Sequence, residues 1–146
     1  MSQISERQYH LIHDSYRRCM LADDFLVMFH RNFMEKSPQI PKFFADHTLQ
    51  QQHRILAKSV ARLVSFVDGK PQAEQDMRDT MRILHDGNLR LTPEHYAFWA
   101  TALMETICTI DEACNDEVAV AWEQTISYGT GVLKKDHSLR NAAYQI

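Results

Sequence analysis

The chain has 146 residues, of which 45% are apolar or aromatic, and its formal net charge is −3. This length suits one domain with a sizeable core, and the absence of a basic cluster argues against nucleic acid as a partner. The sequence contains no apolar run of about 18 residues and no signal-peptide pattern, so we expect a cytoplasmic protein with no membrane partner.

Helix start and stop signals divide the first part of the chain. Ser5 and Gln8 have the spacing of a capping box and predict the start of a first helix. A second helix is expected after Asp24 and ends near Pro38, because a proline disfavours helix at the residue before it. Pro38 then opens a short segment that closes at Phe44.

Similar signals continue to the end of the chain. Thr48 begins a Thr-x-x-Gln box and predicts a long helix that ends at Gly69. A further helix is expected over about residues 72–87. Thr92 is followed by proline and glutamate, a strong helix start, and the last helix is expected from about Asn115.

No segment alternates β-branched residues in the manner of a strand, and the four glycines and four prolines fall near helix boundaries. We therefore expect an all-α fold. One domain is expected over residues 1–135, and residues 136–146 are expected to form a polar C-terminal tail.

His85 is the first candidate for chemistry. It directly precedes Asp86 and Gly87, which signal a helix end, and it shares a helix side with Met77 and Met81. An imidazole on an apolar face near a helix end can serve as an axial ligand to haem iron. The alternative is a core histidine that hydrogen-bonds to a backbone carbonyl.

Two further places carry candidate polar residues. His30 interrupts an apolar stripe between Leu26 and Phe33, and a buried imidazole needs a partner for its N–H. A ligand in a pocket or a hydrogen bond within the core would supply that partner. Gln52 and His53 flank the apolar stripe of their helix on opposite sides, so the periodicity leaves open which of them points inward.

The remaining histidines and the cysteines give no specific signal. Five histidines are expected at the surface or in helix caps: His10, His13, His47, His95 and His137. The three cysteines form no CxxC pair, and we expect them to act as small hydrophobic residues in a reducing cytosol. They are Cys19, Cys108 and Cys114.

Three segments together resemble the globin family, in particular bacterial single-domain globins and the haem domain of flavohaemoglobins. Residues 25–44, FLVMFHRNFMEKSPQIPKFF, are similar to the globin B and C helices and the corner after them, where a phenylalanine follows a proline by six residues, here Pro38 and Phe44. TLQQQHRIL, residues 48–56, is similar to the start of the distal E helix. HDGNLRLTPEHYAFW, residues 85–99, is similar to the proximal histidine segment and the start of the G helix.

The resemblance covers about residues 5–135. It implies a globin fold of about seven helices in a three-over-three arrangement around a haem pocket, with haem b as the cofactor. His85 matches the proximal iron ligand, Phe44 the corner phenylalanine that stacks on the haem, Gln52 the distal glutamine and Leu56 the apolar residue one turn on. The other residues expected around the haem are Phe29, Phe33, Phe43, Met81, Leu84, Arg90, Leu91, Tyr96 and Trp99.

The distal side departs from the bacterial pattern. His30 stands where those globins usually carry a tyrosine that hydrogen-bonds bound oxygen. A shift of one residue in the following helix would bring His53 to the distal position, where His53 or His30 would bind the iron as a sixth ligand.

The function implied is reversible binding of a diatomic gas, oxygen or nitric oxide, at a pentacoordinate iron, as in oxygen transport. We expect a ligand carrier in the first place rather than an enzyme. Two alternatives stay open: a nitric oxide dioxygenase that works with a separate reductase, and a hexacoordinate redox or sensor globin. The sequence is compatible with a monomer or a homodimer.

Overall fold

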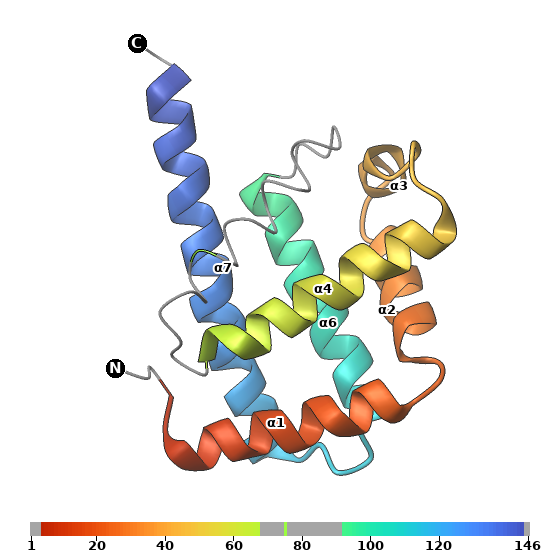
Figure 1. Ribbon diagram of the computed structural model, residues 1–146, viewed down its shortest axis with the longest axis vertical. Helices are drawn as coiled ribbons and strands as arrows, with labels where there is room; N and C mark the ends of the chain where they lie inside the picture. Colours follow the sequence, from red (N-terminus) through yellow and green to blue (C-terminus); the bar gives the residue numbers. More distant parts are fainter. Residues whose placement is uncertain (1–3, 68–74, 76–91, 145–146) are drawn as a thin grey trace.

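The computed structural model describes residues 4–67, 75 and 92–144. In those residues the secondary structure is helical, without strands (Figure 1), so the all-α expectation is confirmed for them. The helices are α1 (Glu6–Leu21), α2 (Phe25–Met34), α3 (Gln39–Phe43), α4 (Leu49–Val67), α6 (Pro93–Ile110) and α7 (Asp116–Tyr144).

Both capping boxes that the sequence predicts are present. The Ser5 hydroxyl accepts the backbone N–H of Gln8 at 3.1 Å, and the Gln8 side chain accepts that of Ser5 at 3.1 Å. Thr48 and Gln51 make the same reciprocal pair at 3.1 and 2.9 Å. Each box satisfies backbone donors that a helix start would otherwise leave unpaired, so these residues fix where α1 and α4 begin.

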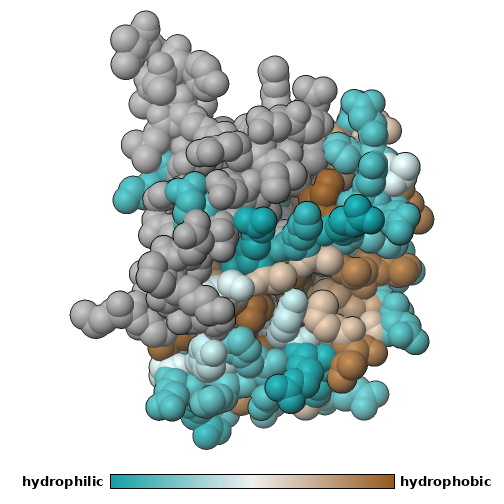
Figure 2. All heavy atoms as spheres, viewed as in Figure 1, coloured by the Kyte–Doolittle hydropathy of each residue, from teal (hydrophilic) through white to brown (hydrophobic). Residues whose placement is uncertain are grey.

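The helices pack in two crossed layers. Helices α6 and α7 lie against each other, α4 crosses them diagonally, and α1 runs across their lower ends (Figure 1). Helix α2 packs against both α4 and α6 and is followed by α3. Hydrophilic residues cover the edge formed by α1, and a band of more apolar residues shows above it (Figure 2).

The face that α2 buries differs from the expected stripe. Phe25, Phe29 and Phe33 are at most 1% exposed, whereas Leu26 and His30 are half-buried. The helix is therefore rotated so that its aromatic side chains fill the core and His30 lies at the border of that core. Leu49, in the first turn of α4, is 59% exposed.

Helix α7 continues through residues 136–144, the segment expected as a polar tail. Figure 1 shows this end of α7 extending beyond the other helices. In the described part of the chain, no helix combines the length and the apolar character needed to cross a bilayer.

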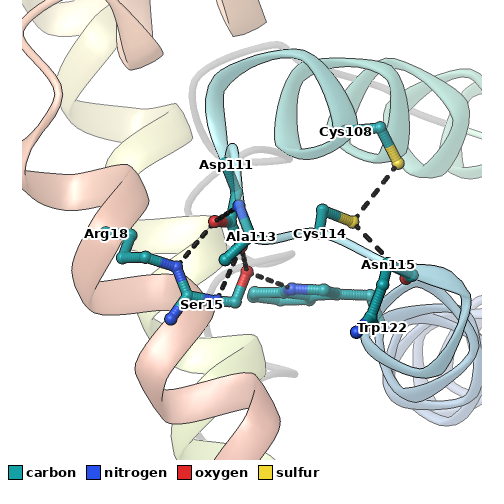
Figure 3. Close-up of polar contacts among 8 residues, drawn as sticks. All are labelled: Ser15, Arg18, Cys108, Asp111, Ala113, Cys114, Asn115 and Trp122. Carbon is teal, nitrogen blue, oxygen red and sulfur yellow. Dashed lines mark hydrogen bonds and ion pairs between the residues drawn. The ribbon is translucent and has the colours of Figure 1, made fainter.

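A buried polar corner ties α1 to the turn between α6 and α7 (Figure 3). The Ser15 hydroxyl donates to Asp111 Oδ2 at 2.6 Å and accepts the Trp122 indole N–H at 2.9 Å. The Arg18 guanidinium donates to both Asp111 oxygens, at 2.6 and 3.0 Å. We call these four residues the α1 corner, because they join three separate segments through one carboxylate.

The Asp111 carboxylate is ionised at neutral pH although it is buried. Burial opposes its charge, but hydrogen bonds from Arg18, Ser15 and the Ala113 backbone N–H outweigh that penalty and hold its pKa below the usual value. Hydrogen bonds from Ser15, Arg18 and Ala113 therefore stabilise the negative charge of Asp111.

Candidate functional site

Three polar side chains meet where α2 packs against α4. His30 Nε2 of α2 lies 2.7 Å from Gln52 Oε1 of α4. The ring of His53 meets the ring of His30 edge-on, with centroids 4.9 Å apart and planes at 70°. We call these residues the His30 cluster. It brings together the two candidates of α4 that the periodicity could not separate, and Gln52 is the one hydrogen-bonded to His30.

The orientation of Gln52 fixes the proton on His30. Gln52 Nε2 donates to the backbone carbonyl of Phe44 at 3.1 Å and to that of His47 at 2.9 Å. Since an amide nitrogen only donates, Oε1 is the atom that faces His30, and an amide oxygen only accepts. His30 Nε2 therefore carries a hydrogen atom and donates a hydrogen bond to Gln52 Oε1.

The His30 cluster borders an apolar wall. Phe29, Phe33, Phe44 and Leu56 are each at most 2% exposed, and the rings of Phe33 and Phe44 pack edge to face at 6.2 Å. Burial, and then the neighbouring charge of His30, lower the pKa of His53. His53 is therefore neutral at neutral pH, as an imidazole on the edge of a core should be.

Helix α6 is tied to α4 by a buried hydrogen bond. Trp99 Nε1 donates to the Ser59 hydroxyl at 3.1 Å, and Ser59 donates to the Leu56 carbonyl at 2.6 Å. Tyr96, one turn before Trp99, is 2% exposed. Both aromatic residues expected in the site from α6 are thus buried in the same core as Leu56.

His95 plays a part that the sequence only partly predicts. Its Nδ1 accepts the backbone N–H of Thr92 at 2.9 Å, so it caps α6, as expected for one of the boundary histidines. Of the two expected alternatives, surface or cap, the structure shows the cap, and the side chain is only 4% exposed. Its Nε2 lies 3.2 Å from Gln39 Oε1, and its ring packs edge-on against Phe43 at 4.9 Å.

Comparison with known proteins gives an informative match. No family model matches the sequence, and no curated protein matches it. A solved structure does: PA3967 of Pseudomonas aeruginosa, described as structurally highly homologous to a human haemoglobin, shares 27% sequence identity with a TM-score of 0.77. The match covers 88% of this chain and 97% of that one. This similarity extends over most of the chain and supports the resemblance to the globin family.

The globin fold predicted from the sequence is therefore confirmed. Within it, the described part of the predicted site comprises His30, Gln52, His53, Leu56, Phe29, Phe33, Phe43, Phe44, Tyr96 and Trp99. The remaining predicted residues lie outside the described residues, and they are Met81, Leu84, His85, Arg90 and Leu91. The roles assigned to both groups stay predictions.

One buried atom near the site was not anticipated. His47 follows Phe44 in the turn between α3 and α4, and their rings lie 6.4 Å apart. Its Nδ1 is buried and has no hydrogen-bond partner among the described residues. A buried imidazole nitrogen without a partner costs free energy, so a group brought beside it would relieve that cost. The sequence marked His47 only as a helix-boundary residue.

Proposed function

We propose that this globin holds a haem and reversibly binds a diatomic gas, oxygen or nitric oxide. The observation that carries the proposal is the His30 cluster, in which a protonated imidazole nitrogen stands at the edge of an aromatic wall in a globin fold. Gas-binding pockets need this combination of an apolar cavity with one or two hydrogen-bond donors.

The residues of this chain fit a haem. Phe44 and Leu56 are fully buried neighbours of the His30 cluster and would exclude water. The orphaned Nδ1 of His47 would gain a partner from a polar group of the cofactor. His85 is proposed as the axial ligand on the resemblance of its segment to the globin proximal segment. When bound, the haem supplies an iron atom with an open position for a small ligand.

Within the His30 cluster, His30 is the donor to the gas ligand and Gln52 is a positioning residue. Both donor contacts of the Gln52 amide go to the backbone carbonyls of Phe44 and His47. His30 Nε2–H is the donor that can be redirected, because leaving Gln52 Oε1 costs only about 1 kcal/mol of net hydrogen-bond free energy. A polar gas ligand repays that cost, whereas an apolar one gains little from His30.

The test replaces the proposed axial ligand. We expect the His85→Ala protein, reconstituted with hemin, to lose the stable Soret band of the wild type. His10→Ala is the matched control, because His10 is an exposed residue of α1 whose side chain is 67% exposed. An unchanged Soret band in His85→Ala, or the same loss in His10→Ala, would remove His85 from this role.

A six-coordinate form is the second candidate, since the structure has an observation that favours it. His53 lies against His30 and its pKa is lowered, which favours the neutral imidazole, and one of the two ring nitrogens of a neutral imidazole is free of a proton and able to bind a metal. The ferrous spectrum without added ligand distinguishes the two forms. A low-spin spectrum that turns high-spin in His53→Leu supports the six-coordinate form, and a high-spin spectrum in the wild type supports the open one.

A further inference from the structure

Two of the three cysteines lie together at the C-terminal end of α6. Cys108 stands in the last turns of α6 and Cys114 in the turn before α7, and their Sγ atoms are 3.8 Å apart (Figure 3). Cys108 is exposed and Cys114 is half-buried, whereas Cys19 is 1% exposed in the core. The sequence spacing gave no sign of this pair, because six positions along a helix do not bring two residues together.

The turn between the helices sets the position of Cys114. Its backbone N–H donates to the Asp111 carbonyl at 3.0 Å, and the Ala113 N–H donates to Asp111 Oδ1 at 3.1 Å. Asp111 in turn donates its own N–H to the Ile107 carbonyl at 2.8 Å and is held by the α1 corner. The backbone thus keeps the two thiols within reach, and a disulfide of about 2 Å needs only side-chain rotation and a small approach.

We propose that Cys108 and Cys114 form an oxidisable dithiol that closes to an intramolecular disulfide by exchange with a small soluble disulfide such as glutathione disulfide. The proposal does not depend on haem. It assigns to this globin a covalent modification site at the turn between α6 and α7.

The two thiols have different parts in the exchange. Exposed Cys108 loses its proton to solvent and attacks glutathione disulfide, which forms a mixed disulfide and releases one glutathione thiolate. Burial, and then the hydrogen bond with Cys108, raise the pKa of Cys114 to about 12, so Cys114 stays a thiol until the mixed disulfide forms beside it. It then loses its proton and attacks the Cys108 sulfur, which releases the second glutathione. Two thiols are oxidised and one disulfide is reduced.

Along α6, the dithiol is separate from Trp99, the aromatic residue expected beside the haem. Cys108 follows Trp99 by nine residues, which is about 13 Å along an α-helix. Oxidation is therefore expected to leave the Soret band unchanged and to act on the local turn. This separation also makes the result independent of the outcome for His85.

The experiment incubates the full-length protein with glutathione disulfide and then blocks the remaining thiols with an alkylating reagent before mass spectrometry. We expect the wild type to lose two hydrogens, to keep one alkylated thiol and to yield a peptide pair joined between Cys108 and Cys114. Cys114→Ser should stop at a glutathione adduct on Cys108, and Cys108→Ser should not react. Cys19→Ala is the control, because alanine adds no polar group to the core, and it should form the same internal disulfide as the wild type.

Other outcomes overturn the proposal. These are a stable glutathione adduct on wild-type Cys108, disulfide-linked pairs of molecules in place of the internal bond, or the same product from Cys114→Ser as from the wild type. Since Cys108 is exposed and serine is smaller and similar in shape, the variants test the chemistry rather than the fold.

Discussion

The α1 corner and the His30 cluster are both groups of polar side chains set into apolar surroundings, but they differ in how completely they are satisfied. In the α1 corner, Ser15, Asp111 and Trp122 are at most 2% exposed and each polar side chain has a partner. In the His30 cluster, the side chains are half-buried and the donor of His30 is held by one amide oxygen.

The difference distinguishes polar groups that stabilise the fold from polar groups that are able to bind a ligand. A carboxylate with four donors has no capacity left for a ligand, and removing any partner leaves a buried group unpaired. An imidazole with a single neutral hydrogen bond can exchange that bond for another at small cost. The nearby buried nitrogen of His47 has no hydrogen-bond partner among the described residues, so it too is able to accept a new one.

The largest predicted effect follows from breaking the α1 corner. Asp111→Ala removes the acceptor of Ser15, Arg18 and the Ala113 N–H together. We expect a loss of about 2–3 kcal/mol in the free energy of unfolding, mainly from the buried hydroxyl, because the Arg18 side chain is 40% exposed and can return to water. Urea unfolding measures it.

Glu112→Ala is the matched control for Asp111→Ala, because Glu112 is the next residue and is exposed. Its unfolding midpoint should stay within error of the wild type. If Asp111→Ala also left the unfolding midpoint unchanged, the α1 corner would not stabilise the contact between α1 and the turn. Its contrast with the His30 cluster would then be wrong.

A smaller effect on stability and a larger one on ligand kinetics are expected at the His30 cluster. His30→Leu removes the movable donor while keeping an apolar side chain of similar size. If one hydrogen bond to the gas ligand is lost, the oxygen release rate rises about tenfold, which corresponds to about 1.4 kcal/mol. Stopped-flow displacement of oxygen by carbon monoxide measures it.

Carbon monoxide serves as the internal control for His30→Leu, because it is less polar than bound oxygen and depends less on a donor. Its release rate should change by a smaller factor than that of oxygen. Equal oxygen release from the wild type and the variant would take His30 out of the binding site, whatever becomes of His85.

Local signals in the sequence were enough for the starts of α1 and α4 and for part of the site, whereas the helix expected over about residues 72–87 lies outside the described residues and the expected tail is part of α7. The boxes at Ser5 and Thr48 involve residues three apart, so their hydrogen bonds could be predicted before any packing was known. The spacing of Pro38 and Phe44 was one of the patterns that indicated a resemblance to the globin family. The rotation of α2 could not be predicted, because Phe25 and Leu26 are both apolar and the choice between them depends on what α4 and α6 offer.

Long-range polar contacts were beyond the sequence. Ser15 and Asp111 are 96 positions apart, and neither residue stands out in its own segment. Gln52 and His53 were both candidates because each flanks the apolar stripe, and only the carbonyls of Phe44 and His47 determine which one is oriented toward His30. His95 was noticed as a boundary residue, but its burial depends on Phe43 from a separate helix.

The smallest predicted effect is a pH dependence of stability, and it involves His95 at the start of α6. His95 is neutral in the fold, because its Nδ1 accepts the Thr92 N–H and because burial, partly opposed by Glu94, lowers its pKa from 6.5. As pH falls below about 6.5, the unfolded chain takes up a proton that folded His95 resists, so stability declines with acidification. Thermal unfolding at about pH 7.5 and about pH 5.5 measures this decline.

His95→Gln tests which group is responsible. Glutamine already occupies the third helical position in the boxes of α1 and α4, at Gln8 and Gln51, where its oxygen accepts the same kind of backbone N–H. The variant should therefore keep the α6 cap, and although it loses the ring contact with Phe43, its stability should fall less on acidification than that of the wild type, with His53 supplying the part that remains. An unaltered pH dependence in His95→Gln would mean that the acid sensitivity arises elsewhere, and that the cap of α6 tolerates a charged imidazole.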